Sequence, residues 1–149
     1  MDPVDATGPM RLVLCAFPGP AEADRVIDRV LAARLAACAN ALPIRSRYWW
    51  KGRVEAAEET LVLFKTVPKR VGALFRLLAS DHRYEVPEIL ELDVPRVHPP
   101  YLAYLAATID ADAPPLPLGG GRPSPRRRGS PRGRGARRPG RTRARPRRP

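Results

Sequence analysis

The residue types best suited to metal chemistry are a histidine and a carboxylate, His82 and Glu88, which lie six positions apart. Imidazole and carboxylate groups together suit Zn(II) or Cu(II). A loop between a helix and a strand can bring two such groups together, so the pair predicts a divalent-cation site. The alternative is a histidine that stabilises the C-terminus of a helix, with the carboxylate in solvent or in an ion pair.

Cys15 and Cys38 are the other candidate ligands, and their thiolates would favour Cu(I). Two cysteines are too few for a disulfide framework. In the sheet predicted below, a strand over residues 60–65 separates the two cysteine strands. Two strand spacings are about 9.5 Å, which exceeds the roughly 4.4–6.8 Å between the Cα atoms of a disulfide. The separation also argues against one metal held by both thiols within a subunit, so we expect each cysteine to be buried and inert.

Aromatic side chains are concentrated in one short run, Tyr48, Trp49 and Trp50. Such a run could stack on nucleobases, clamp a small ligand or pack, and aromatics at a hairpin end are more often interface anchors. The sequence has no Gly-rich phosphate loop, no HExxH and no GxSxG pattern. It holds two histidines, of which His98 is expected on the surface in a turn. We therefore predict a protein without enzymatic activity.

A long β-hairpin is expected to position these groups. Runs of strand-forming residues over 36–50 and 59–66 lie on either side of a tight Lys51-Gly52 turn. A hairpin of this length is not stable alone and needs a covering layer. The near-continuous apolar run 11–17 is typical of a central strand buried on both faces.

Two amphipathic helices are expected to supply that layer. Apolar residues from Val26 to Leu35 form one stripe, and those from Val71 to Leu78 form a second at i, i+3, i+4 and i+7. Thr66 is expected to cap the second helix, with Pro68 in its first turn.

A strand over 86–94 and a short helix over 101–108 complete a pattern that predicts an α+β fold. With right-handed crossovers, the order gives a ferredoxin-like βαββαβ sandwich with an extra C-terminal helix. In this sandwich two helices cover one face of a four-stranded antiparallel sheet. The other face would be open, and it is apolar at Leu61 and Leu63. Open apolar faces are buried by partners, so we expect an oligomer.

Charge is distributed unevenly along the chain. The formal net charge is +12, but residues 1–112 carry −1 and residues 113–149 carry +13, from thirteen arginines and no acid. Residues 113–149 also have too few apolar groups to offset the entropy of ordering, so we expect a disordered tail that binds polyanions. Residues 1–9 are expected to be flexible, which leaves a folded domain over 10–112. Met10 could be the true start.

The sequence contains no signal-peptide pattern. It also contains no apolar run of about 18 residues, the length that a membrane-spanning helix needs. We therefore expect a protein that is neither secreted nor membrane-spanning, with the cytoplasm as its default location.

Four motifs between about Arg11 and Ile109 carry a family resemblance. They are Leu35–Asn40, Tyr48–Gly52, Glu59–Thr66 and Tyr84–Ile89. In this order and spacing they resemble the CutA divalent-cation tolerance family. The resemblance implies a cytoplasmic homotrimer of ferredoxin-like subunits, similar in architecture to PII signalling proteins. It also implies copper and other divalent metals as ligands, and no established enzymatic activity.

The resemblance extends to single residues. Cys15 and Cys38 match positions at which copper has been implicated in some members. A cleft between subunits would be lined by Trp50, Glu59, Lys65, Tyr84 and Glu88. The alternative for Glu59 and Lys65 is an ordinary ion pair. Two positions depart from the family pattern, since Arg83 stands where Pro is usual and Tyr104 where Trp is common. Because Arg83 would add flexibility and positive charge beside the cation, we expect weaker metal binding than is typical of the family.

The competing interpretation is a nucleic-acid-binding protein. RNA-recognition motifs share this strand order, and the arginine-rich tail would contact phosphates. Those domains carry aromatics on their central strands, whereas the run 59–65 has only Phe64. The folded domain is therefore a poor match for an RNA reader, and polyanion binding is expected of the tail alone. A third interpretation is that the tail has no role. Arg, Pro, Gly and Ala have GC-rich codons, so weakly selected read-through in a GC-rich genome would give this composition.

Overall fold

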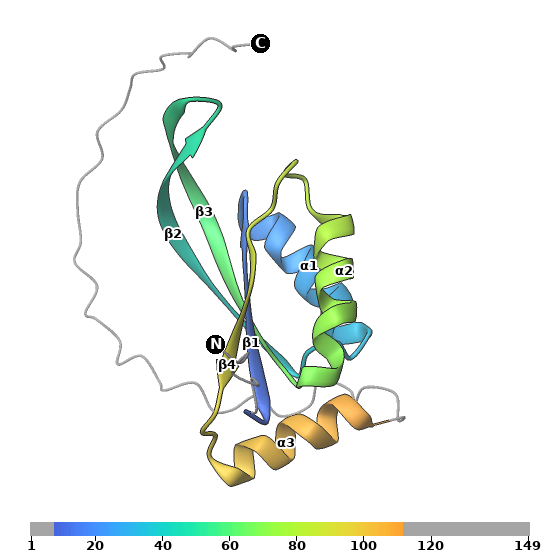
Figure 1. Ribbon diagram of the computed structural model, residues 1–149. Coiled ribbons are helices and arrows are strands. Elements are labelled where there is room, and N and C mark those ends of the chain that lie inside the picture. Colours follow the sequence, from blue (N-terminus) through green and yellow to red (C-terminus); the bar gives the residue numbers. More distant parts are fainter. Residues whose placement is uncertain (1–7, 112–149) are drawn as a thin grey trace, which may run out of the picture. The chain divides into compact units, whose positions relative to one another are not determined.

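The computed structural model describes residues 8–111, which form a four-stranded antiparallel sheet and three α-helices (Figure 1). The elements are β1 (Met10–Phe17), α1 (Pro20–Ala32), β2 (Cys38–Trp50), β3 (Arg53–Thr66), the 3-10 turn η1 (Pro68–Arg70), α2 (Val71–Asp81), β4 (Ile89–Val94) and α3 (Pro99–Asp110). The strand order is β2-β3-β1-β4, so β2 and β4 are the edges. This is the predicted ferredoxin-like βαββαβ arrangement with an extra C-terminal helix. The tail predicted over 113–149 lies outside the described residues.

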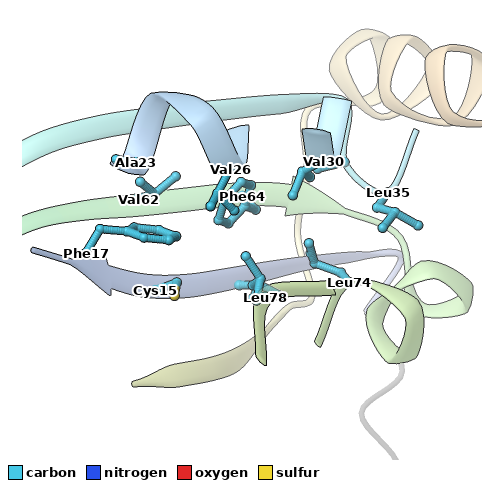
Figure 2. Close-up of a cluster of buried hydrophobic side chains, with 12 residues drawn as sticks. Cys15, Phe17, Ala23, Val26, Val30, Leu35, Val62, Phe64, Leu74 and Leu78 are labelled. Carbon is cyan, nitrogen blue, oxygen red and sulfur yellow. The ribbon is translucent and has the colours of Figure 1, made fainter. Parts of the chain in front are cut away.

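One face of the sheet is covered by α1 and α2, and the main core lies beneath them (Figures 1 and 2). Alternate residues of β1 and β3 point toward this layer, as the period of two in a strand requires. The buried cluster includes Val13, Cys15, Phe17, Val26, Val30, Val62, Phe64, Leu74 and Leu78. The two helical stripes predicted from the sequence therefore face the core.

Thr66 does not cap the second helix, and that prediction is wrong. Thr66 is the last residue of β3, and its buried hydroxyl donates to the Leu35 carbonyl at 2.7 Å. The chain passes through η1 before α2, and neither element has a side-chain cap. A buried hydroxyl needs an acceptor, and the nearby carbonyl supplies one that the sequence pattern does not reveal.

The hairpin turn lies at Lys51-Gly52, as predicted. Both residues have positive φ, 48° and 79°, which is the backbone of a type I′ turn. β2 pairs with β3 along its whole length, whereas β1 reaches only Thr60–Thr66 of β3. Residues 44–50 and 53–59 therefore form a two-stranded extension, here called the ribbon, that projects beyond the sheet (Figure 1).

The sheet face opposite α1 and α2, here called the open face, is lined with leucine. In an antiparallel sheet, residues paired across strands point to the same side, so the register places these side chains in rows. They are Leu12, Leu14, Leu42, Leu61, Leu63, Leu90 and Leu92. Leu90 and Leu92 are 48% and 49% exposed. A contiguous apolar patch of this kind marks an interaction site.

α3 packs across one end of the sheet (Figure 1), where Leu105 and Ile109 are buried against Met10. The guanidinium of Arg34 donates to the Thr108 carbonyl at 2.7 Å. A cation at a helix C-terminus is attracted to the negative end of the helix dipole, so this contact stabilises the docked helix. No helix in the described part of the chain is long and apolar enough to cross a membrane.

Candidate functional site

Polar side chains interrupt the leucines at one edge of the open face, and we call Cys38, Asn40 and Lys65 the polar row. Cys38 lies opposite Lys65 in register, and Asn40 points to the same side two residues further along β2. The Lys65 ammonium donates to Asn40 Oδ1 and, at 3.7 Å, to Cys38 Sγ. Sequence reasoning did not single out Asn40. Its i, i+2 spacing from Cys38 on a strand could have indicated that the two side chains share one face of the sheet.

Cys15 points to the opposite face of the sheet from Cys38. It is fully buried in the core under the helices. Burial, aided by the negative charge of Glu88, raises the pKa of the Cys15 thiol to about 12. A thiol in this state is a poor metal ligand and nucleophile. Since β3 also lies between the two cysteine strands, one chain cannot bring both thiols to one metal ion.

His82 contacts two aromatic rings at the end of α2. Its ring stacks on Phe17 at a centroid distance of 4.9 Å and lies 4.8 Å from the ring of Tyr84. His82 Nε2 lies 2.7 Å from the Ala16 carbonyl oxygen, and the Tyr84 backbone N–H donates to Nδ1 at 3.1 Å. A carbonyl can only accept, so Nε2 carries the proton and both ring nitrogens are engaged. His82 can bind a metal only after one of these bonds breaks.

Glu88 is exposed and lies immediately before β4. Within residues 8–111, no three His, Cys, Asp or Glu side chains are grouped so that they could hold a metal ion. Zinc sites have three or four protein ligands. Residues 8–111 of one chain therefore do not complete the divalent-cation site predicted at His82 and Glu88.

Tyr84 and Glu59 are brought together from separate parts of the chain. The Tyr84 hydroxyl donates to Glu59 Oε2 at 2.9 Å, and Glu59 is 9% exposed. Burial, together with this hydrogen bond and the Glu59 charge, raises the pKa of Tyr84 to about 12. The contact ties the loop between α2 and β4 to the base of the ribbon.

Tyr84 should ionise late in an alkaline titration. Its folded pKa of about 12 lies above its ordinary value of 10.0, so the neutral phenol stabilises the fold below pH 10 and this contribution is lost as the pH rises toward 12. The difference in phenolate absorbance between the wild type and Tyr84→Phe should therefore have its midpoint near pH 12. Glu59→Gln should lower that midpoint in part, because burial remains. An unchanged midpoint would show that Glu59 has no influence on Tyr84.

The other residues of the predicted intersubunit cleft lie apart within one chain. Trp50 is at the tip of the ribbon, whereas Glu59 is at its base. Lys65 lies in the polar row, six residues beyond Glu59 on β3. The fold thus brings Glu59 to Tyr84 and Lys65 to Cys38, but it brings Trp50 to neither pair. A common cleft would need a second copy of the chain.

Arg83 is not a free charge beside the proposed cation. Its guanidinium pairs with Glu22 Oε1 at 3.0 Å, at the start of α1. The Arg83 side chain is 72% exposed, so the pair contributes at most about 1 kcal/mol. The contact nevertheless directs the charge toward the helix layer and ties down the loop that was expected to be flexible.

Sequence reasoning also missed the charge network around the buried Arg11. The Arg11 side chain is 6% exposed and pairs with Glu91 at 2.9 Å and Asp93 at 2.5 Å. It also donates to the Gly8 carbonyl at 2.6 Å, and the Gly8 N–H donates to Asp93 at 3.2 Å. Gly8, which was assigned to a flexible N-terminus, therefore takes part in the fold. The alternation of residues on β4 was the sequence pattern that could have revealed this network. This alternation turns Glu91 and Asp93 to the side of the sheet that faces the helices, where two acids need a cation.

Comparisons with known proteins identify similar chains. The family described as "CutA1 divalent ion tolerance protein" matches residues 11–108. Proteins named "Divalent-cation tolerance protein CutA" from Citrobacter koseri and Escherichia coli are 39% and 38% identical over 99 residues. The match covers 66% of this chain and 86% and 88% of those proteins.

Solved structures of CutA proteins share the fold. The structure from Archaeoglobus fulgidus has a TM-score of 0.67 and 30% identity, covering 68% of this chain and 99% of that one. The structure from Synechococcus elongatus PCC7942 has a TM-score of 0.67 and 32% identity, covering 70% and 93%.

The Archaeoglobus fulgidus relative is described as a periplasmic protein. This finding contradicts the cytoplasmic location predicted from the sequence, and that prediction is wrong. It depended on the absence of a signal-peptide pattern, and such an absence does not determine a compartment.

Proposed function

The chain belongs to the CutA1 divalent ion tolerance family, and from this we propose that it acts in divalent-cation tolerance as a homotrimer without enzymatic activity. The observation that carries the proposal is the family match over residues 11–108, which includes all four strands of the sheet. A PII-like signalling role would use the same trimer and is part of the proposal.

Two features of the single chain support an assembly. The open face presents a leucine patch with exposed members, including Leu90 and Leu92. The ribbon has only two strands, and an isolated two-stranded hairpin is marginally stable in water. Further copies of the same chain would cover both features. Three copies is the number that the family resemblance implies.

We propose copper or zinc as the cation, bound where subunits meet. His82 and Glu88 remain the proposed ligands from one subunit, and another subunit has to supply the rest. Coordination through His82 Nδ1 requires the hydrogen bond from the Tyr84 backbone to open. Because that bond and the ring packing would be disturbed, we expect the net affinity to be low.

Metal titration should depend on His82 and Glu88 more than on either cysteine. In calorimetric titrations of the full chain with Zn(II) and Cu(II), we expect His82→Ala and Glu88→Gln each to weaken binding by at least the roughly tenfold that loss of a residue supporting a ligand costs. Cys38→Ser should bind like the wild type. His98→Ala is the matched control, because it removes the only other imidazole. If Cys38→Ser abolishes binding while His82→Ala does not, the ligand is a thiolate and the assignment is wrong.

Nothing in the fold or the comparisons favours the nucleic-acid alternative. Polyanion binding by residues 113–149 remains a prediction that depends on their net charge of +13. These residues lie outside the described part of the chain.

A further inference from the structure

We infer that the polar row, Cys38, Asn40 and Lys65, is a binding site for a small oxyanion that carries a carboxylate or phosphate group. The inference goes beyond cation tolerance, because the groups gathered there suit an anion and not a metal ion. It is carried by the hydrogen-bonding capacity of the three side chains and by the lack of a countercharge for Lys65.

The polar row presents donors. An ammonium group has three N–H donors and no acceptor, and Lys65 uses two of them on Asn40 Oδ1 and Cys38 Sγ. Asn40 accepts that bond with its oxygen, which leaves its amide NH₂ as a donor. The Cys38 thiol adds a weak donor. Carboxylate and phosphate oxygens are the acceptors that match such a set.

Lys65 has no carboxylate partner among residues 8–111. Other buried or half-buried cations in the described part of the chain have charged partners or backbone carbonyls, since Arg34 donates to Thr108 and Arg70 to Ile109, whereas Lys65 donates to two neutral side chains. Arg11 has two carboxylates, and even the exposed Lys69 has Asp110. The side chains that continue the row of Lys65 across the sheet are Leu12 and Leu92. An anion is therefore the missing component of this cluster.

Covering the open face increases the need for a countercharge. A half-buried ammonium that loses its water without a partner destabilises the covered state by several kcal/mol in general. A metal cation on Cys38 would add repulsion from Lys65, whereas an oxyanion would remove the unpaired charge. Because β2 is an edge strand, the polar row lies at the border of the sheet, where a small ligand can reach it. This step assumes the proposed trimer, so its test measures mass separately.

The test is protection of Cys38 from alkylation by iodoacetamide in the full chain. Cys15 is 0% exposed, so Cys38 is the thiol that reacts. Inorganic phosphate is titrated at constant ionic strength, with chloride as the replacement salt. We expect the alkylation rate of the wild type to fall about tenfold when phosphate reaches about ten times its Kd, by mass action. Lys65→Met should lose this protection, and Lys51→Met, which removes a lysine from the hairpin turn, should keep it.

Two results would overturn the inference. The first is equal protection of wild type and Lys65→Met, which would mean that phosphate acts elsewhere, for example on the arginines of the tail. The second is no protection of the wild type while Lys65→Met lowers the native mass, which would mean that a carboxylate of another subunit occupies the polar row. Light scattering on the same samples tests the proposed trimer independently of the anion site. If phosphate protects Cys38 in a protein of monomer mass, the anion site is supported and the trimer is contradicted.

Discussion

Replacing Leu63 by lysine should convert the proposed trimer into folded monomers. Leu63 lies on the open face, in a row with Leu14 and Leu90. In one chain its side chain is only partly buried, so the monomer can accept a lysine there. In a covered face the new ammonium would lose water without a partner, at a cost of several kcal/mol per ion. The free energy from burying the remaining exposed part of the leucine, a fraction of the about 1.5–3 kcal/mol for full burial, would be lost as well.

Light scattering at micromolar concentration measures this result directly. The wild type should have three times the chain mass of 16.5 kDa, and Leu63→Lys should have that mass once. Leu31→Lys is the matched control, because Leu31 is 37% exposed on α1, in the layer that covers the opposite face of the sheet. Circular dichroism confirms that each variant is folded. A wild type of monomer mass, or a trimeric Leu63→Lys, would contradict the proposed assembly.

Trp50→Ala tests the ribbon in the same assay. Trp50 is 37% exposed in the single chain, which leaves part of the ring for a neighbour to cover. If that neighbour buries the ring, truncation should weaken assembly by about 3–5 kcal/mol. Trp49→Ala is the comparison, since Trp49 is 76% exposed on the other side of the ribbon. Equal effects of the two variants would show that Trp50 has no special role as an anchor.

Replacing Arg11 by methionine should destabilise the fold by about 1.5–3 kcal/mol, the range for losing hydrogen bonds between charged groups, because Glu91 and Asp93 are themselves 40% and 33% exposed. The substitution leaves Glu91 and Asp93 without the cation that separates them. It also removes the donor to the Gly8 carbonyl. The midpoint of thermal unfolding should fall by roughly 10 °C for a domain of this size.

Arg29→Met is the control for this prediction. Arg29 pairs with Asp81, but its side chain is 56% exposed, so its loss should cost less than about 1 kcal/mol. Arg11→Lys should fall between the two, because lysine retains the charge but cannot reach both carboxylates in the same way. Equal unfolding midpoints for Arg11→Met and Arg29→Met would show that the charge network around Arg11 adds no more stability than an exposed ion pair.

The elements and their order were predictable from the sequence because the patterns that specify them are local. Alternation over 59–66 indicates a strand, and the spacing from Val71 to Leu78 indicates a helix, whatever those segments later contact. Gly52 supplies the positive φ that the hairpin turn needs. The order of these elements then leaves few topologies, of which the observed one has right-handed crossovers.

The meeting of particular side chains was decided only by the tertiary structure. Thr66 bonds to a carbonyl 31 residues away, and His82 bonds to one 66 residues away. The opposite orientations of Cys15 and Cys38 depend on register, since a shift of one residue in a strand turns every side chain to the other face. The sequence by itself therefore determined the strands, the helices and the family to which they belong. The partners of His82, Lys65 and Arg11 depended on the packing, because each buried polar group bonds to whatever donor or acceptor the complete fold places beside it.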